Sequence, residues 1–178
     1  MNIKVPGDKK IVIRKIVKSD LKNAKAFQKY INDLVAENAM VGRSEKATIK
    51  EENEFLKSAA KKSTQKIFLV MFCDKIPIGV ANVTQEKRVL NHIGAFGISI
   101  VKDYRGMGLG KKLMAEAIEY AKREFKPKPK IIQLRVYIEN KSAISMYKKM
   151  GFKIVAKLPK QIQHKGKLID ELIMNKYL

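Results

Sequence analysis

The chain of 178 residues is 46% hydrophobic and 31% charged, which is typical of one globular domain covering residues 1–178 and argues against a disordered chain. Its formal net charge of +21 favours anionic ligands, nucleic acid among them. No apolar run is long enough to cross a bilayer, and no signal-peptide core follows the lysine-rich start, so we expect a cytoplasmic protein without membrane contact. One cysteine and two separated histidines argue against a disulfide and against a metal site.

The positive charge is spread along the chain rather than gathered into one stripe. Of the 38 basic residues, 32 are lysine and six are arginine. Lysine is a mobile point charge, whereas planar, bidentate recognition of bases favours arginine. We therefore predict a solvated cationic surface that attracts anions and binds nucleic acid only non-specifically, through charge.

The first third of the chain predicts a strand followed by two helices. Residues 11–16 have an apolar strand pattern, and Ser19 is suited to cap a helix whose apolar spacing of three and four residues fades at Asn38. Further on, Thr48 and Glu51 have the spacing of a capping box, which predicts a second helix reaching about residue 62. The apolar positions of the first helix are Leu21, Ala24, Phe27, Ile31 and Leu34.

The middle of the chain changes to the two-residue period of strands. Runs at 67–73, 76–84 and 92–101 are joined by polar turns and predict an antiparallel meander. An amphipathic helix follows over residues 109–125, and prolines after it lead into the apolar run 131–138, which is typical of a buried strand. A strand, a helix and a strand in this order predict a right-handed crossover between two parallel neighbours.

The last part of the chain predicts a short helix and a closing hairpin. Asn140 is suited to cap the helix and Gly151 to end it in the left-handed conformation. Residues 152–158 and 168–174 flank a turn signal and predict two antiparallel strands. The whole chain is predicted to be an α/β protein: a mixed sheet of about seven strands, largely antiparallel with a central parallel pair, and helices on both faces.

Three glycines mark the junction between the meander and the following helix. Gly106, Gly108 and Gly110 are unfavourable at a helix start and are expected where the backbone comes close to a ligand. Free N–H groups and the positive end of the helix dipole predict an anion site there, and a phosphorylated ligand. A Walker loop is excluded because Lys112 stands where Ser or Thr is needed, and a dinucleotide fingerprint lacks its third glycine.

The pattern Arg105-x-x-Gly108-x-Gly110 resembles the pyrophosphate-binding motif of the GNAT family of acyl-CoA-dependent N-acetyltransferases. The segment IENKSAISMYKKMGFKIV, residues 138–155, is similar to the other hallmark of that family. The resemblance covers essentially the whole chain. It implies a GNAT fold with acetyl-CoA as cosubstrate, CoA as product, a primary amine of a small molecule, peptide or protein as acceptor, no metal, and either a monomer or a homodimer.

The resemblance also implies which residues meet acetyl-CoA. Asn140 is expected to contact the CoA arm besides capping its helix, and Tyr147 is expected to protonate the departing thiolate, although packing alone would also explain a tyrosine there. A backbone N–H near Gly94 and Gly97, where a bulge or a close approach is expected, would stabilise the tetrahedral transition state. The residues expected to pair with the pantetheine arm are Ile98, Ser99 and Ile100. The expected pyrophosphate loop comprises Arg105, Gly106, Met107, Gly108, Leu109, Gly110 and Lys111.

The general base is left open by the sequence. Many members of the family carry a glutamate on the fourth strand, where this chain has Ala95, so His92, Glu86 or a chain of waters is expected to take the proton of the acceptor. The sequence offers no cysteine or serine partnered with a base, so we expect direct attack of the amine in a ternary complex. A non-catalytic acyl-CoA sensor and a basic nucleic-acid-associated protein are the alternatives.

Acceptor specificity is implied to come from residues 20–62 and 159–169. Both segments carry more basic than acidic residues, nine against seven and three against none, so a cationic polyamine would be repelled at long range. We predict an amine on a neutral or acidic molecule, or an amino terminus or lysine beside acidic residues.

Overall fold

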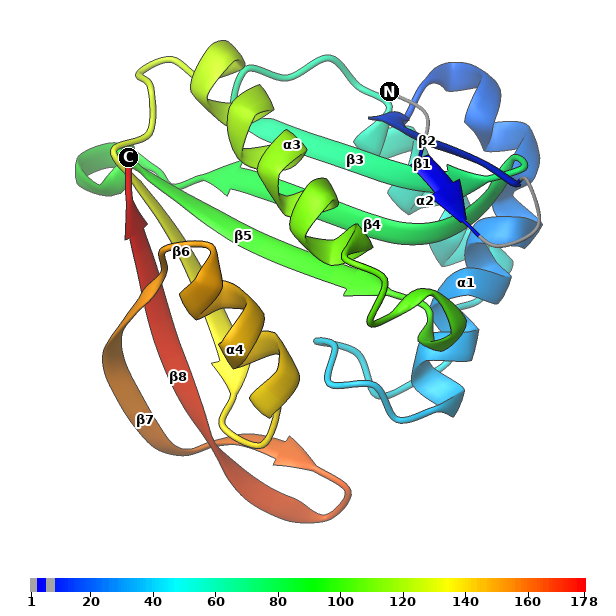
Figure 1. Cartoon of the computed structure of the whole chain (residues 1–178). Coiled ribbons are helices and arrows are strands. Elements are labelled where there is room, and N and C mark those ends of the chain that lie inside the picture. The colour runs from blue at the N-terminus through cyan, green and yellow to red at the C-terminus, as the bar shows by residue number, and fades with distance from the viewer. Residues whose placement is uncertain (1–2, 6–8) are drawn as a thin grey trace.

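A mixed sheet with helices on both faces makes up the computed structural model, which describes residues 3–5 and 9–178 (Figure 1). The strands lie in the order β1-β2-β3-β4-β5-β6-β8-β7. They are β1 (Ile3–Val5), β2 (Lys9–Lys15), β3 (Lys66–Cys73), β4 (Ile76–Gln85), β5 (Ile93–Ile100), β6 (Ile131–Tyr137), β7 (Lys153–His164) and β8 (Lys167–Tyr177). The α-helices are α1 (Ala24–Ala36), α2 (Ile49–Ala59), α3 (Leu109–Glu124) and α4 (Lys141–Lys149), and the 3-10 helices are η1 (Lys18–Asn23), η2 (Arg88–Leu90) and η3 (Lys102–Tyr104).

The predicted fold class is confirmed. Among the described strands, β5 and β6 form the one parallel pair, and the other neighbours in the sheet are antiparallel. The described residues contain eight strands rather than about seven, because the three-residue strand β1 pairs with β2 and is too short to carry a period of its own. The meander, the crossover helix and the strand after it lie within two residues of their predicted bounds.

The two parallel strands separate after a short stretch of pairing. Residues Ile93–Phe96 of β5 pair with Ile131–Leu134 of β6, and the pairing ends there. Beyond this point β5 stays paired with β4, whereas β6 stays paired with β8. Figure 1 shows the two strands diverging toward their carboxyl ends, with the loop after α1 near the mouth of the gap. The fold therefore opens a wedge where the glycine loop begins.

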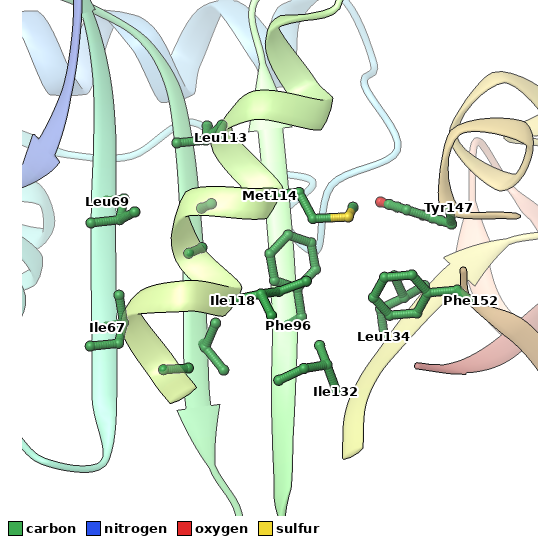
Figure 2. Packing of buried hydrophobic residues seen from close by; sticks show 14 of the residues in the cluster. Ile67, Leu69, Phe96, Leu113, Met114, Ile118, Ile132, Leu134, Tyr147 and Phe152 are labelled. Carbon is green, nitrogen blue, oxygen red and sulfur yellow. The ribbon is translucent and has the colours of Figure 1, made fainter. Parts of the chain in front are cut away.

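Helices bury both faces of the sheet. α3 packs on β3, β4 and β5 through an apolar stripe that is fully buried, as its spacing predicts. Figure 2 shows Met114 and Ile118 of this stripe beside Phe96 of β5. On the other face, Phe27 of α1 and Leu56 of α2 belong to a second apolar cluster.

The prediction that Ser19 caps the first helix is wrong. Ser19 lies inside η1, and α1 begins only at Ala24 and ends at Ala36, short of Asn38. The carboxylate of the next residue, Asp20, organises the entry instead: it accepts a hydrogen bond from the Val17 N–H at 2.8 Å and two from the Arg14 guanidinium at 2.6 and 2.7 Å. A carboxylate satisfies more donors than a serine hydroxyl, so the chain turns around Asp20.

Replacing Asp20 with asparagine is expected to lower the free energy of unfolding by about 1–3 kcal/mol, because the buried Asp20 side chain loses its charged contact with the partly exposed Arg14. Burial alone would raise the pKa of the Asp20 carboxyl, but Arg14 and the Val17 N–H together hold it below its ordinary value. A lowered pKa stabilises the fold above the unfolded value of about 3.9, and that contribution is lost as the pH falls through the folded pKa. Urea unfolding at pH 7 and pH 3 measures it. Equal midpoints at pH 7 for the variant and the wild type would contradict the role of Asp20.

The other caps are confirmed. The Thr48 hydroxyl accepts from the Glu51 N–H at 3.2 Å and the Glu51 carboxylate accepts from the Thr48 N–H at 2.7 Å, although α2 ends at Ala59, earlier than predicted. Gly151 ends α4 with φ +87°. The closing hairpin is longer than predicted, because β7 and β8 continue to a two-residue turn at 165–166. Most of β7 is exposed, so its residues lack a clear apolar pattern.

Candidate active site

A cleft of about 1070 Å³ occupies the wedge between β5 and β6. Its wall on one side is the loop 37–42 after α1, and on the other side the start of α4. The floor comes from the carboxyl-terminal halves of β5 and β6, and the glycine loop stands at one end. The fold thus brings the two sequence hallmarks, 105–110 and 138–155, to one cavity.

The glycine loop has the conformation of an anion site. Gly106 and Gly108 have φ +78° and +75°, and a Cβ added at either would meet no atom within 4 Å. The backbone conformation, rather than crowding, therefore requires glycine at both positions. The first amides of α3 follow directly, and the N–H groups of a first helical turn have no carbonyl partner within their own helix. These donors and the helix dipole suit a phosphate group.

The remaining residues of the loop have different roles. A Cβ on Gly110 would lie 3.1 Å from the sulfur of Met146, so this glycine lets α3 approach α4. The Leu109 side chain is buried in the core, and Met107 is half exposed. Neither side chain lines the cleft, so only their backbone amides are placed for a ligand. Lys111 does line the cleft and is exposed.

Arg105 is held in place within the protein. Its Nε donates to the Ile100 carbonyl at 2.8 Å, and its terminal nitrogens pair with the Glu37 carboxylate at the end of α1. The guanidinium thereby links the loop after β5 to the loop after α1. Arg105 lines the cleft beside the glycine loop, with its charge paired to that of Glu37.

The register of β5 decides which peptide groups face the gap. The Val101 N–H donates to the Ile78 carbonyl, so the residues that exchange hydrogen bonds with β4 alternate from there and include Ser99. The peptide groups of Ile98 and Ile100 point the other way, beyond the end of pairing with β6. Ser99 does not fit the predicted backbone contact with the pantetheine arm, because its backbone faces β4 and its hydroxyl lies 2.7 Å from that of Tyr30.

Close approach, rather than a bulge, accounts for the two glycines of β5. The register between β4 and β5 is continuous. A Cβ on Gly97 would lie 2.8 Å from the Asn82 side-chain oxygen, and one on Gly94 would lie 2.9 Å from Val83. The side chains of β4 therefore lean over β5 at both positions.

Tyr147 is packed in the core and also lines the cleft. The side chain is 7% exposed, its ring lies 5.9 Å from that of Phe152, and the residue lines the cavity. Figure 2 shows the hydroxyl directed from α4 toward Met114 of α3. Burial raises the pKa of Tyr147 to about 12. The hydroxyl is thus protonated at neutral pH and can donate a proton.

Asn140 caps α4 and also lines the cleft. Its side-chain oxygen accepts from the Ala143 N–H at 3.2 Å, which confirms the capping role. The same oxygen accepts from the Ser142 hydroxyl at 3.3 Å. Lys141, Ser142 and Ala143 of the capped helix start also line the cavity.

Neither His92 nor Glu86 lies at the cleft. The His92 carbonyl accepts from the Lys130 and Ile131 N–H groups, and the Glu86 N–H donates to the Ile93 carbonyl, so both residues lie at the amino-terminal end of β5. Because a strand rises about 3.3 Å per residue, His92 is about 20 Å from Ile98. The structure therefore does not support either residue as the base.

The structure instead brings a carboxylate to the cleft that the sequence prediction missed. Glu171 of β8 is 4% exposed and lines the cavity, with its Oε2 3.3 Å from the Arg135 Nε of β6. A single glutamate inside the apolar run LIDELIM was the available signal.

The described residues contain no group of three or more histidine, cysteine or acidic side chains that could hold a metal ion. Within the described part of the chain, no helix is long and apolar enough to span a membrane.

Comparison with known proteins agrees with this geometry. Residues 30–152 match the model of the acetyltransferase (GNAT) family. An acetyltransferase of the GNAT family from Streptococcus pneumoniae is 29% identical and superposes with a TM-score of 0.81 over 94% of this chain and 99% of that chain. The chain belongs to the GNAT family of acetyltransferases, as its two motifs predicted.

Relatives with more specific names match over shorter stretches. The L-amino acid N-acetyltransferase AaaT of Escherichia coli is 30% identical over 51% of this chain and 54% of its own length. An N-alpha-acetyltransferase of Sulfurisphaera tokodaii is 29% identical over 46% of this chain and 47% of its own length. The chain thus spans about half the length of these curated relatives. Salmonella typhimurium yncA, whose structure was solved with its cofactor acetyl-CoA, has the same fold. It superposes with a TM-score of 0.77 over 94% of both chains at 18% identity.

Proposed function

We propose that the protein transfers the acetyl group of acetyl-CoA to an amine by direct attack in a ternary complex. One arrangement carries the proposal: the Ile98 peptide group and the Ile100 N–H face a cleft that ends at the glycine loop, and Tyr147 lines the same cleft. Acetyl-CoA has a pyrophosphate, an amide-bearing arm and a thioester in that order. The loop suits the pyrophosphate, and the exposed edge of β5 suits the amides.

The chemistry then follows from the groups at the cleft. The amine nitrogen attacks the thioester carbonyl carbon, and we expect the Ile98 N–H to donate to the oxygen that becomes negative. As the carbon–sulfur bond breaks, the thiolate takes the proton of the Tyr147 hydroxyl. Because the pKa of Tyr147 is about 12, this donor is available over the whole neutral range.

The acceptor we propose is an α-amino group on a neutral or acidic amino acid or peptide. The names of two relatives, an L-amino acid and an N-alpha-acetyltransferase, support an acceptor of this kind. The net charge of +21 opposes a polyamine, because long-range repulsion lowers the local concentration of polycations.

Two measurements test this function. Titration calorimetry with acetyl-CoA at about 0.15 M salt, where loose phosphate attraction is screened, is expected to show one site per chain. Thiol release at low salt is expected to be faster with L-methionine or an acidic peptide with a free amino terminus than with spermidine. Absence of acetyl-CoA binding would overturn the transferase proposal. Faster turnover of spermidine would overturn the acceptor proposal alone.

A further inference from the structure

Glu171 is a buried carboxylate with an unfilled acceptor position at the cleft. The residue is 4% exposed, and its Oε2 has no hydrogen-bond partner among the described residues. Leaving a buried charged oxygen without a donor costs free energy, and such groups in native proteins are ordinarily satisfied. The unfilled position therefore indicates that a donor is supplied from outside the chain.

The cation nearest to Glu171 does not fill this position. The Arg135 Nε lies 3.3 Å from Oε2, which is an ionic contact, but its N–H is not directed at the oxygen as a hydrogen bond requires. The Arg135 side chain is 57% exposed, so water screens its charge. The arginine lowers the cost of burying the carboxylate and leaves its lone pairs available.

The strand register points Glu171 to the side of the sheet opposite Tyr147. The next residue of β8, Leu172, belongs to the apolar cluster that includes Tyr147, and successive side chains of a strand alternate between faces. Glu171 is the direct partner of Tyr137 on β6, and the Tyr137 hydroxyl donates to the Val41 carbonyl of the loop after α1 at 3.2 Å. The carboxylate thus enters the cleft beside loop 37–42, away from α3 and α4.

We propose that Glu171 binds the ammonium of the acceptor and takes one of its protons before attack on the thioester. This inference rests on the proposed function. The neutral amine then forms the bond to carbon, and Tyr147 gives its proton to the thiolate as the carbon–sulfur bond breaks. The second proton of the nitrogen restores the Tyr147 hydroxyl, the third stays on the amide, and Glu171 releases its proton to water.

The charges around the site also define the acceptor. Glu171 offers one buried position for one ammonium, and the half-exposed guanidinium of Arg135 beside it favours a carboxylate or carbonyl over a second cation. The site therefore fits an amine that is flanked by neutral or anionic groups. The site thus selects at short range the same neutral or acidic acceptors that the net charge of the protein favours at long range.

The test compares Glu171→Gln, Glu171→Asp and a matched control, Asp170→Asn, which removes a carboxylate at the neighbouring position that pairs with Lys157 outside the cleft. With L-methionine or the acidic peptide as acceptor, kcat/KM of Glu171→Gln is expected to fall about a hundredfold or more. Glu171→Asp retains a carboxylate and should recover part of that loss, and Asp170→Asn should act as the wild type. The Kd of acetyl-CoA is expected to stay within about twofold in all three.

Each outcome decides between the two proposals. A Glu171→Gln protein that binds acetyl-CoA and keeps kcat/KM within about threefold of the wild type would overturn the role of Glu171 and leave the transferase proposal standing. A loss of acetyl-CoA binding in Glu171→Gln would also overturn it, since the carboxylate would then support the cofactor site. A wild-type protein that binds acetyl-CoA but releases no thiol with any acceptor would overturn the proposed function, and Glu171 with it.

Discussion

Replacement of Tyr147 by phenylalanine is expected to lower kcat about a hundredfold or more while the Kd of acetyl-CoA changes little. General acids contribute factors of this size, and the hydroxyl is the one group removed. The ring remains, so the packing against Phe152 in the core is kept. Because burial raises the pKa of Tyr147 to about 12, the wild-type rate should show no loss of this acid between pH 7 and pH 10. Thiol release and calorimetry provide the two numbers.

Tyr177→Phe is the matched control for this variant. Tyr177 is 63% exposed at the end of β8, remote from the cleft, and its variant should keep full activity. Wild-type turnover by Tyr147→Phe would show that the tyrosine is a packing residue. Acetyl-CoA binding without turnover in the wild type itself would favour the acyl-CoA sensor that the sequence left as an alternative.

Substitution of Gly108 by tryptophan is expected to weaken acetyl-CoA binding about a hundredfold or more. Gly108 has φ +75°, which a tryptophan adopts only at a cost of about 1–2 kcal/mol, and the indole would stand where the pyrophosphate is proposed to bind. Loss of two charge-assisted hydrogen bonds, each contributing about 1.5–3 kcal/mol, corresponds to at least that loss of affinity. Calorimetry at about 0.15 M salt measures it.

The hairpin turn offers a control with the same backbone strain. Gly166 has φ +71° and, like Gly108, no atom within 4 Å of an added Cβ. Gly166→Trp should lose similar stability and keep the affinity for acetyl-CoA. Equal binding by the two variants would remove the glycine loop from the proposed site and leave the +21 charge as the explanation for any attraction of phosphates.

The elements that the sequence predicted well depend on contacts within a few residues. The capping box of Thr48 and Glu51 and the cap of Asn140 on Ala143 each join positions three apart. Gly151 ends α4 through its own backbone conformation. The prediction for Ser19 was wrong because the neighbouring Asp20 binds Arg14, and a capping rule considers only the cap and its helix.

The site was predictable only where a motif is contiguous. The glycine loop and the α4 segment each lie on one short stretch, so Gly108 and Tyr147 could be singled out without a structure. The backbone contacts of β5 were predicted only in part, because a shift of one residue exchanges the peptide groups that face β4 with those that face the gap. Ser99 fell on the wrong side of that alternation.

Sequence alone determined the order of the elements, the family and the two motifs, since local hydrogen bonds and apolar spacing depend on residues that are close together in the chain. Only the tertiary structure decided the acid–base groups of the cleft. Pairing of β6 with β8 places Glu171 beside Tyr137 and Arg135, more than thirty positions away in the chain. His92 lies just before the first residue of β5, whereas Ile98 lies near its last residue, so the strand separates them. Such distances follow from strand pairing and register, which no local pattern specifies.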